Sequence, residues 1–200
     1  MYFSKKTFTY GPEELSSKLL EGSAALFPTD TLPALASAPE AASQLWNIKK
    51  RPSKKPLILM GAIPSQLFEF VSLISLEDAE KMANRFWPGA LTMILPASGP
   101  IVDSLNPGGA NIGMRVPACE ATIELLLKSG PLATTSANLA GHSPCLNARE
   151  AFNLFPDLPL LGPLPWPLGS GLASTVIAWS GRGCWQVLRR GAVIIPEDKK

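Results

Sequence analysis

Residues 39–60 have the sequence PEAASQLWNIKKRPSKKPLILM, in which a pattern typical of a helix is followed by one typical of a strand. From Pro39 to Lys49, apolar residues recur with the spacing of a helix that buries one face. The run Leu57–Met60 is short, apolar and uninterrupted, as in a buried strand. A helix followed at once by a buried strand favours an α/β fold.

The same alternation continues on both sides of this stretch. It predicts further helices over residues 11–20, 64–70, 76–86 and 118–128, and further strands over residues 24–27, 91–95, 112–116, 132–135, 174–178 and 184–188. We therefore expect one α/β domain over residues 1–200, with a core from about 8 to 195. Flanking helices should cover a mixed parallel and antiparallel sheet.

Composition and charge exclude several classes of protein. The 200 residues carry a formal net charge of +2, too small to indicate a nucleic-acid partner without local clustering. The start MYFSKK lacks the apolar core of a signal peptide, and no apolar run approaches a membrane span, so we expect a cytoplasmic protein without a membrane partner. Cys119, Cys145 and Cys184 lie far apart, which predicts reduced, mostly buried thiols.

Prolines crowd one segment, residues 156–171. Five of them precede the sequence Gly169-Ser170-Gly171, and such a density is incompatible with a helix. The segment should form a stiff loop, either as a lid that moves over a site or as a plain connection.

Two polar motifs predict an anion site. Lys49-Lys50-Arg51-Pro52 ends the helical pattern, and Thr134-Thr135-Ser136-Ala137-Asn138 follows a predicted strand about eighty residues later. Two cations, a hydroxyl and a carboxamide can hold phosphate or carboxylate oxygens without a metal cage. The motifs therefore indicate an anion or nucleotide site.

Six ordered motifs carry a resemblance that covers nearly the whole chain. They are Phe27-Pro28-Thr29-Asp30-Thr31, Ile48-Lys49-Lys50-Arg51-Pro52, Lys55-Pro56-Leu57-Ile58-Leu59, Trp87-Pro88-Gly89-Ala90-Leu91-Thr92, Gly113-Met114-Arg115-Val116-Pro117 and Thr134-Thr135-Ser136-Ala137-Asn138-Leu139. In order and spacing the chain resembles the YrdC-like family. The resemblance implies a twisted open α/β sheet with a concave, basic face that binds a nucleotide.

The family's enzymes are threonylcarbamoyl-AMP synthases. The resemblance implies that the substrates are L-threonine, bicarbonate and ATP. The products would be pyrophosphate and the intermediate for tRNA threonylcarbamoyladenosine. Downstream tRNA threonylcarbamoyl-transfer proteins would be partners. RNA contact on the basic face is a further expectation. Mg²⁺ should accompany ATP, held mostly by phosphate oxygens and water. Cations are needed because the carbamate and the α-phosphate are both negatively charged.

The resemblance also implies roles for individual residues. Those matching the family's catalytic tetrad are Lys49, Arg51, Ser136 and Asn138. Those expected to bind ATP are Arg51, Lys55, Asn111, Ser136, Asn138, Ser143 and Arg189. Those expected to bind threonine are Thr31, Arg115, Thr134 and Ser174. No metal ligands are expected, because His142 is the only histidine.

Each of these residues also has a structural interpretation. Lys49 and Arg51 could complement a helix dipole, and Ser136 and Asn138 could cap a turn. Arg115 on an apolar strand could form a structural salt bridge. Thr31 and Ser174 could satisfy backbone groups.

One stretch departs from the family pattern. Leu32-Pro33-Ala34-Leu35-Ala36 stands where the family usually has Val-Tyr-Gly-Leu-Gly, so an aromatic ring and two glycines are absent. This departure keeps a second hypothesis open, a divergent paralogue that binds RNA or the ribosome with weak or no synthase activity. A serine hydrolase and a Walker-type ATPase are excluded, because neither Gly-x-Ser-x-Gly nor Gly-x-x-x-x-Gly-Lys-Ser/Thr occurs. Carbamoyltransferase maturation proteins carry further domains that 200 residues cannot hold.

Overall fold

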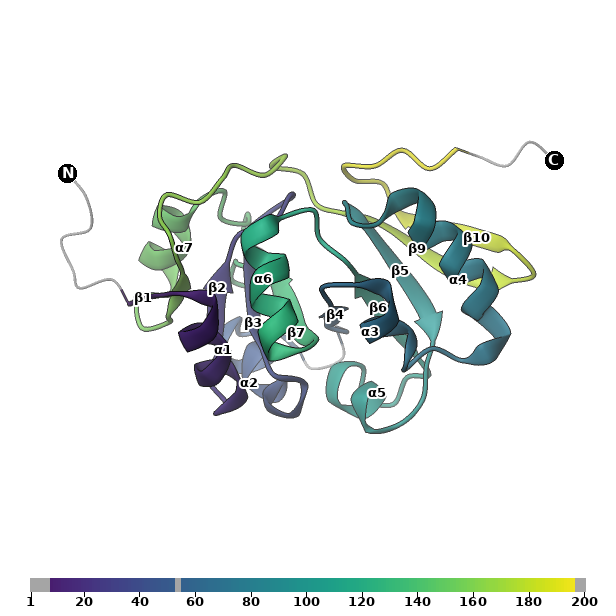
Figure 1. The fold of residues 1–200 in the computed structure, drawn as a ribbon, viewed down its shortest axis with the longest axis horizontal. Coiled ribbons are helices and arrows are strands. Elements are labelled where there is room, and N and C mark those ends of the chain that lie inside the picture. The colour runs from purple at the N-terminus through teal and green to yellow at the C-terminus, as the bar shows by residue number, and fades with distance from the viewer. Residues whose placement is uncertain (1–7, 53–54, 197–200) are drawn as a thin grey trace.

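The computed structural model describes residues 8–52 and 55–196, and within them the strands form one sheet (Figure 1). Its ten strands lie in the order β1-β8-β2-β3-β7-β4-β6-β5-β9-β10. Their bounds are β1 Thr9–Tyr10, β2 Ala25–Phe27, β3 Ala34–Ser37, β4 Ile58–Met60, β5 Leu91–Pro96, β6 Asn111–Arg115, β7 Leu132–Ser136, β8 Leu160–Leu161, β9 Thr175–Gly181 and β10 Cys184–Arg189.

Helices flank this sheet. Their bounds are α1 Pro12–Leu20, the 3₁₀ helix η1 Pro39–Ala41, α2 Ser43–Ile48, α3 Pro64–Phe68, α4 Leu73–Phe86, α5 Pro100–Leu105, α6 Glu120–Ser129 and α7 Ala148–Leu154. Helices α1 and α6 lie side by side, and α4 packs beside β5 (Figure 1). The helix predicted over residues 39–49 is two elements, since η1 ends at Ala41 and α2 begins at Ser43.

Strand pairing confirms the mixed sheet. Strand β8 runs parallel to both β1 and β2, and the pairs β4–β6 and β5–β9 are also parallel. The remaining pairs are antiparallel. Because β4 and β6 are parallel, their last residues, Met60 and Arg115, are partners at the same end of the sheet.

The sheet is buried on both faces, and the alternation along its strands explains how. In β2, Phe27 belongs to the cluster under α1 and α6, whereas its neighbour Leu26 belongs to the cluster that contains Leu45 of α2. All three side chains are fully buried. Successive strand residues point to opposite faces, so one short strand contributes to both cores.

Five elements were not predicted from the sequence. They are β1, β3, α5, α7 and β8. Strand β3 has only four residues, and two of them are alanines, which have low strand propensity. Helix α7 carried a signal that the prediction overlooked: the Asn147 side chain accepts a hydrogen bond from the Glu150 amide at 3.0 Å and donates one to its carboxylate at 2.7 Å.

The proline-rich segment, residues 156–171, is mainly loop, as predicted, but contains β8. Its end is bonded to the stretch before β3. The Ser170 amide donates to the Asp30 carbonyl at 2.9 Å, and the Gly171 amide donates to the Thr31 carbonyl at 3.1 Å. This segment therefore supports a stretch that lines the candidate site.

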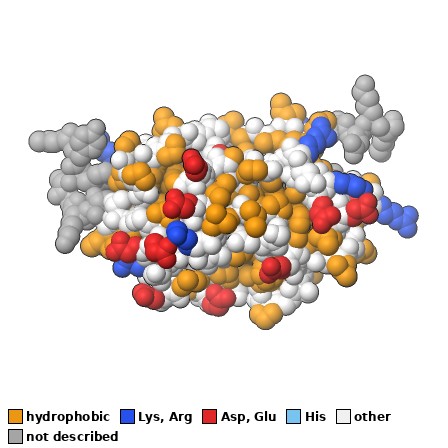
Figure 2. Space-filling view, viewed as in Figure 1, with side chains coloured by type: hydrophobic (Ala, Val, Ile, Leu, Met, Phe, Trp, Pro, Cys, Tyr) orange, Lys and Arg blue, Asp and Glu red, His pale blue; other side chains and the backbone are white. Residues whose placement is uncertain are grey.

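On the face seen in Figure 2, acidic side chains are scattered, and Lys and Arg side chains lie toward both ends. None of the helices in the described ranges combines the length and apolarity needed to cross a membrane. All three cysteines are free thiols; Cys119 and Cys145 are buried and Cys184 is exposed, which agrees with the prediction of mostly buried thiols.

Candidate functional site

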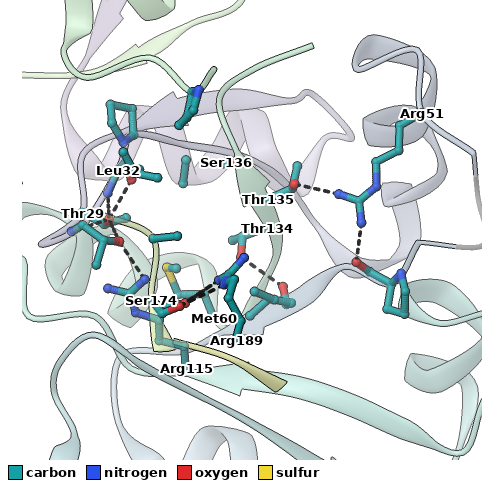
Figure 3. A pocket seen from close by; sticks show the side chains of 17 residues that line it. Thr29, Leu32, Arg51, Met60, Arg115, Thr134, Thr135, Ser136, Ser174 and Arg189 are labelled. Carbon is teal, nitrogen blue, oxygen red and sulfur yellow. Dashed lines mark hydrogen bonds between the residues drawn. The ribbon is translucent and has the colours of Figure 1, made fainter. Parts of the chain in front are cut away.

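A cavity of about 390 Å³ opens where β3, β7, β4 and β6 lie next to one another (Figure 3). This volume is within the roughly 300–1,000 Å³ typical of small-molecule sites. The lining residues are Thr29, Thr31, Leu32, Pro33, Ala34, Arg51, Pro56, Ile58, Met60, Arg115, Thr134, Thr135, Ser136, Pro144, Ala173, Ser174 and Arg189. They come from segments as far apart in the chain as residues 29 and 189.

Arg115, at the end of β6, is buried and held on three sides. Its Nε donates to the Gly89 carbonyl at 3.0 Å, one terminal nitrogen donates to Thr31 Oγ1 at 2.8 Å, and the other donates to Asp30 Oδ1 at 2.6 Å. The same Asp30 oxygen also accepts from the Ala118 amide at 3.0 Å. The structural salt bridge foreseen for Arg115 is therefore present, and its guanidinium nevertheless lines the cavity.

Two hydroxyls lie close to a second arginine. Ser174 Oγ lies 2.8 Å from Thr92 Oγ1, and Arg189 donates to the Ser174 carbonyl at 2.9 Å and to its Oγ at 3.2 Å. Thr134 Oγ1 donates to the Ile58 carbonyl at 3.1 Å. Figure 3 shows Arg115 and Arg189 on the same side of the cavity as Ser174.

Arg51 lies across the cavity from these groups (Figure 3). One terminal nitrogen donates to Thr135 Oγ1 at 3.1 Å, and the other donates to the Pro56 carbonyl at 2.9 Å. Its Nε is buried and has no hydrogen-bond partner among the described residues. A buried N–H without a partner is costly. Each terminal nitrogen also keeps one N–H group without a partner among the described residues.

Lys49 is the C-cap of α2 and is only 2% exposed. Its Nζ donates to the Ser136 carbonyl, to the Asn138 carbonyl at 2.7 Å and to Asn138 Oδ1 at 2.8 Å. Ser136 Oγ also donates to Asn138 Oδ1, at 2.7 Å. The four tetrad positions thus lie together, but only Arg51 and Ser136 line the cavity.

Burial disfavours the charged form of the cations in this region. It lowers the pKa of Arg51 and of Arg189, and it lowers the pKa of Arg115 against the opposing influence of the Asp30 carboxylate. Arginine keeps its charge nonetheless. An anion in the cavity would offset this cost, because it would be attracted to three guanidinium groups.

The predicted site residues fall into two groups. Seven of them line the cavity: Thr31, Arg51, Arg115, Thr134, Ser136, Ser174 and Arg189. The other five do not: Lys49, Lys55, Asn111, Asn138 and Ser143. Lys55 and Ser143 are exposed beside the lining residues Pro56 and Pro144, whereas Asn111 starts β6, four positions from Arg115, and pairs with Pro96.

The stretch that departs from the family pattern forms part of the wall. Leu32, Pro33 and Ala34 line the cavity, and the Pro33 carbonyl accepts a hydrogen bond from the Ala137 amide at 2.9 Å. The sequence prediction overlooked Asp30 and Thr135, which orient Arg115 and Arg51. Both residues lie inside the motifs that carry the family resemblance, and this position in the sequence is the signal that could have identified them.

The described residues contain no group of three or more His, Cys, Asp or Glu side chains that could hold a metal ion. The polar groups that line the cavity are instead guanidinium groups and hydroxyls. Such donors suit an anionic ligand.

Comparisons with known proteins agree with this arrangement. The Sua5/YciO/YrdC family model, described as "Telomere recombination", matches residues 17–191. Threonylcarbamoyl-AMP synthase of Bacillus subtilis strain 168 is 36% identical over 175 residues, which cover 82% of this chain and 49% of that protein. Threonylcarbamoyl-AMP synthase of Bos taurus is 30% identical over 188 residues, which cover 89% and 67%.

Solved structures share the fold. Sua5 of Pyrococcus abyssi complexed with L-threonine has a TM-score of 0.84 at 27% identity, and the match covers 94% of this chain and 58% of that one. YciO of E. coli has a TM-score of 0.76 at 21% identity, over 94% and 96%. This chain spans at most about half the length of the curated relatives from Pyrococcus abyssi and Bacillus subtilis, of which 39% and 49% are matched.

Proposed function

The chain belongs to the Sua5/YciO/YrdC family, and from that premise we propose that it catalyses the reaction after which its curated relatives are named, threonylcarbamoyl-AMP synthesis. In that reaction the amine of L-threonine and bicarbonate form a carbamate, with loss of water. A carbamate oxygen attacks the α-phosphate of ATP, and pyrophosphate leaves. The product is L-threonylcarbamoyladenylate, which downstream tRNA threonylcarbamoyl-transfer proteins would consume.

One observation carries this proposal: three arginines line one cavity, and no described Asp or Glu side chain does. The reaction brings an anionic carbamate to a polyanionic nucleotide, so charge repulsion has to be offset at the place where they meet. Arg51, Arg115 and Arg189 approach that place from different segments. This distribution suits two anionic groups better than one.

The threonine end would lie at Arg115. Of its five N–H groups, three have partners among the described residues, so two remain for a carboxylate. Thr31, Thr134 and Ser174 supply hydroxyls on the same side. The hydroxyl and carboxylate of threonine are groups that such donors and acceptors recognise.

The nucleotide end would lie at Arg51 and Ser136. Two N–H groups of Arg51 have described partners, and three do not. These donors can stabilise the charge that grows on the α-phosphate and on the leaving pyrophosphate. No covalent intermediate with the protein is needed.

Two further expectations belong to this proposal. Mg²⁺ would be held mainly by phosphate oxygens and water, because the cavity offers no carboxylate. Contact with tRNA is a second expectation, since the phosphates of RNA are attracted to the same arginines that line the cavity.

The test measures pyrophosphate release from ATP, with and without L-threonine and bicarbonate. We expect release to need both substrates and to fall on the order of 100-fold in Arg51→Ala, the loss typical of removing one donor to a developing anion. Arg149→Ala is the matched control, because Arg149 is exposed on α7 and does not line the cavity.

Each other outcome has a definite meaning. Equal turnover in Arg51→Ala and Arg149→Ala would reject the assignment of the site. A folded wild-type protein that binds RNA without releasing pyrophosphate would instead be the divergent binding paralogue. In that case RNA binding should fall as salt is raised, because it would rest on phosphate contacts.

A further inference from the structure

The hydrogen bonds of Lys49 leave it nothing to offer a ligand. An ammonium group has three N–H donors, and all three are used by oxygens of Ser136, the last residue of β7, and of Asn138 in the turn that follows. The side chain is almost fully buried and does not line the cavity. Contact with a substrate oxygen would require at least one of these bonds to break.

Asn138 is equally committed. Its Oδ1 accepts from Lys49 and from Ser136, which occupies both lone pairs. Its Nδ2 donates to the Leu139 carbonyl at 2.9 Å and to the His142 carbonyl at 2.7 Å, which uses both N–H groups. Asn138 also lies outside the cavity lining.

Arg51 and Ser136 are different on both counts. Both line the cavity, so their side chains can be reached by a ligand. Each terminal nitrogen of Arg51 keeps one N–H group that has no partner among the described residues. Ser136 Oγ donates to Asn138, which leaves its lone pairs to accept a hydrogen bond.

We propose that Lys49 and Asn138 are positioning residues that hold the turn of residues 136–142, whereas Arg51 and Ser136 are the members of this tetrad that contact the ligand. The identity of that ligand rests on the proposed function. The role of the turn does not.

Backbone bonds show why this turn needs an internal cation. The Ala140 amide donates to the Lys49 carbonyl at 3.0 Å, and the Cys145 amide donates to the Ala137 carbonyl at 2.9 Å. These bonds tie the end of α2, the turn and the following loop together. Three turn oxygens converge on one point, and Lys49 supplies the positive charge that such a cluster of acceptors requires.

The first experiment tests the turn without any ligand. Hydrogen exchange of the Ala140 and Cys145 amides is measured by NMR in wild type, Lys49→Met and Lys50→Met. We expect exchange to accelerate roughly tenfold or more in Lys49→Met, because hydrogen bonds to a charged group are lost. Lys50→Met is the matched control, since Lys50 is the exposed neighbour.

The second experiment asks which side chain meets the ligand. Magnesium ATP is added to the wild-type protein, and the resonances of Lys49 Nζ and Arg51 Nε are followed. We expect Arg51 Nε to shift on saturation and Lys49 Nζ to stay near its free position. This readout needs no variant, so a misfolded Lys49→Met protein would not prevent the test.

The outcomes separate the two proposals. Unchanged amide exchange in a folded Lys49→Met protein, or a Lys49 Nζ shift as large as that of Arg51, overturns the positioning role. Absence of any response to magnesium ATP at both resonances counts against the proposed function, and the exchange result then decides the role of Lys49 alone.

Discussion

Lys49 is a buried cation whose neighbours affect its charge in opposite directions. Burial has the largest effect and lowers its pKa from 10.5 to about 8, and repulsion by Arg51 acts in the same direction. Cys145 acts in the opposite sense. A pKa near 8 means that the positive charge under the turn is lost within a pH range that enzyme assays can reach.

We therefore predict that pyrophosphate release falls as pH rises through about 8. A neutral amine has two N–H groups for three turn oxygens, so the turn that presents Ser136 should loosen. The measurement is turnover from about pH 6.5 to about pH 9.5 with saturating substrates. Higher pH provides more unprotonated threonine amine, so a fall in rate could not come from that substrate.

Stability should change in the opposite sense. Between about pH 8 and 10.5 the unfolded chain keeps a proton on Lys49 that the folded chain has lost, so the free energy of unfolding contributed by this residue rises with pH. Lys49→Met lacks this contribution and is the comparison for denaturant unfolding at both ends of the range. For the prediction on turnover, a rate of pyrophosphate release that stays level through about pH 9.5 would contradict the proposed effect of losing the Lys49 charge.

Four residues that the sequence analysis grouped together also lie together in the structure. Thr31, Arg115, Thr134 and Ser174 were grouped by resemblance to family motifs, and they line one cavity. Asp30 was not foreseen as the partner of Arg115, because the pair spans 85 positions in the chain and depends on which strands are neighbours. A motif gives residue types at a spacing, whereas partners across a sheet follow from strand order.

At the scale of elements, the proline-rich segment is a support for the site. Gly169 lies directly against the backbone of residues 29–31, since an added Cβ would lie 2.8 Å from the Thr29 carbonyl oxygen and closer still to that of Thr31. Two backbone hydrogen bonds of the next residues fix the contact. Through these contacts the end of the segment braces the cavity wall.

Gly169→Ala should therefore destabilise the protein by about 1–3 kcal/mol, the usual cost of overpacking. It should also weaken L-threonine binding roughly tenfold or more, because Thr31 would be displaced. Gly113→Ala is the matched control: its Cβ would meet Ile58 and Thr92 at an ordinary 3.5 Å. Thermal unfolding and calorimetric titration with threonine measure the two effects, and equal results for both variants would refute the bracing role.

Element prediction succeeded where periodicity was long and failed where tertiary contacts decide. Helix α4 and strand β5 have enough residues for a clear pattern, and both were predicted. Strand β8 has two residues within a proline-rich segment, so only its pairing with β1 and β2 makes it a strand. Strand β3 was obscured by Pro33 and by its alanines, although its four residues are all buried.

At the scale of the whole molecule, the sheet joins two hydrophobic cores. Strand β3 contributes Leu35 to one core and Ala34 and Ala36 to the other. A change at such a strand is transmitted to both layers, because adjacent residues of one rigid backbone fill both. This geometry favours unfolding as one unit.

We predict that Leu35→Ala lowers the free energy of unfolding by about 2–5 kcal/mol, since a fully buried leucine leaves a cavity. Denaturant unfolding followed by tryptophan fluorescence and by far-UV circular dichroism should still give one coincident transition. Leu73→Ala, at an 85% exposed position, is the control and should change little. Two separate transitions would show that the cores unfold independently.

The position of β8 between β1 and β2 has a consequence for how the chain is assembled. Among the described strands, β1 pairs with β8 alone, and β8 is formed by residues 160–161. As the polypeptide is synthesised, residues 9–10 come first, yet their sheet partner appears about 150 positions later. This edge of the sheet closes by a contact of very long sequence separation, which is entropically slow to form, so the first strand made is among the last to be secured.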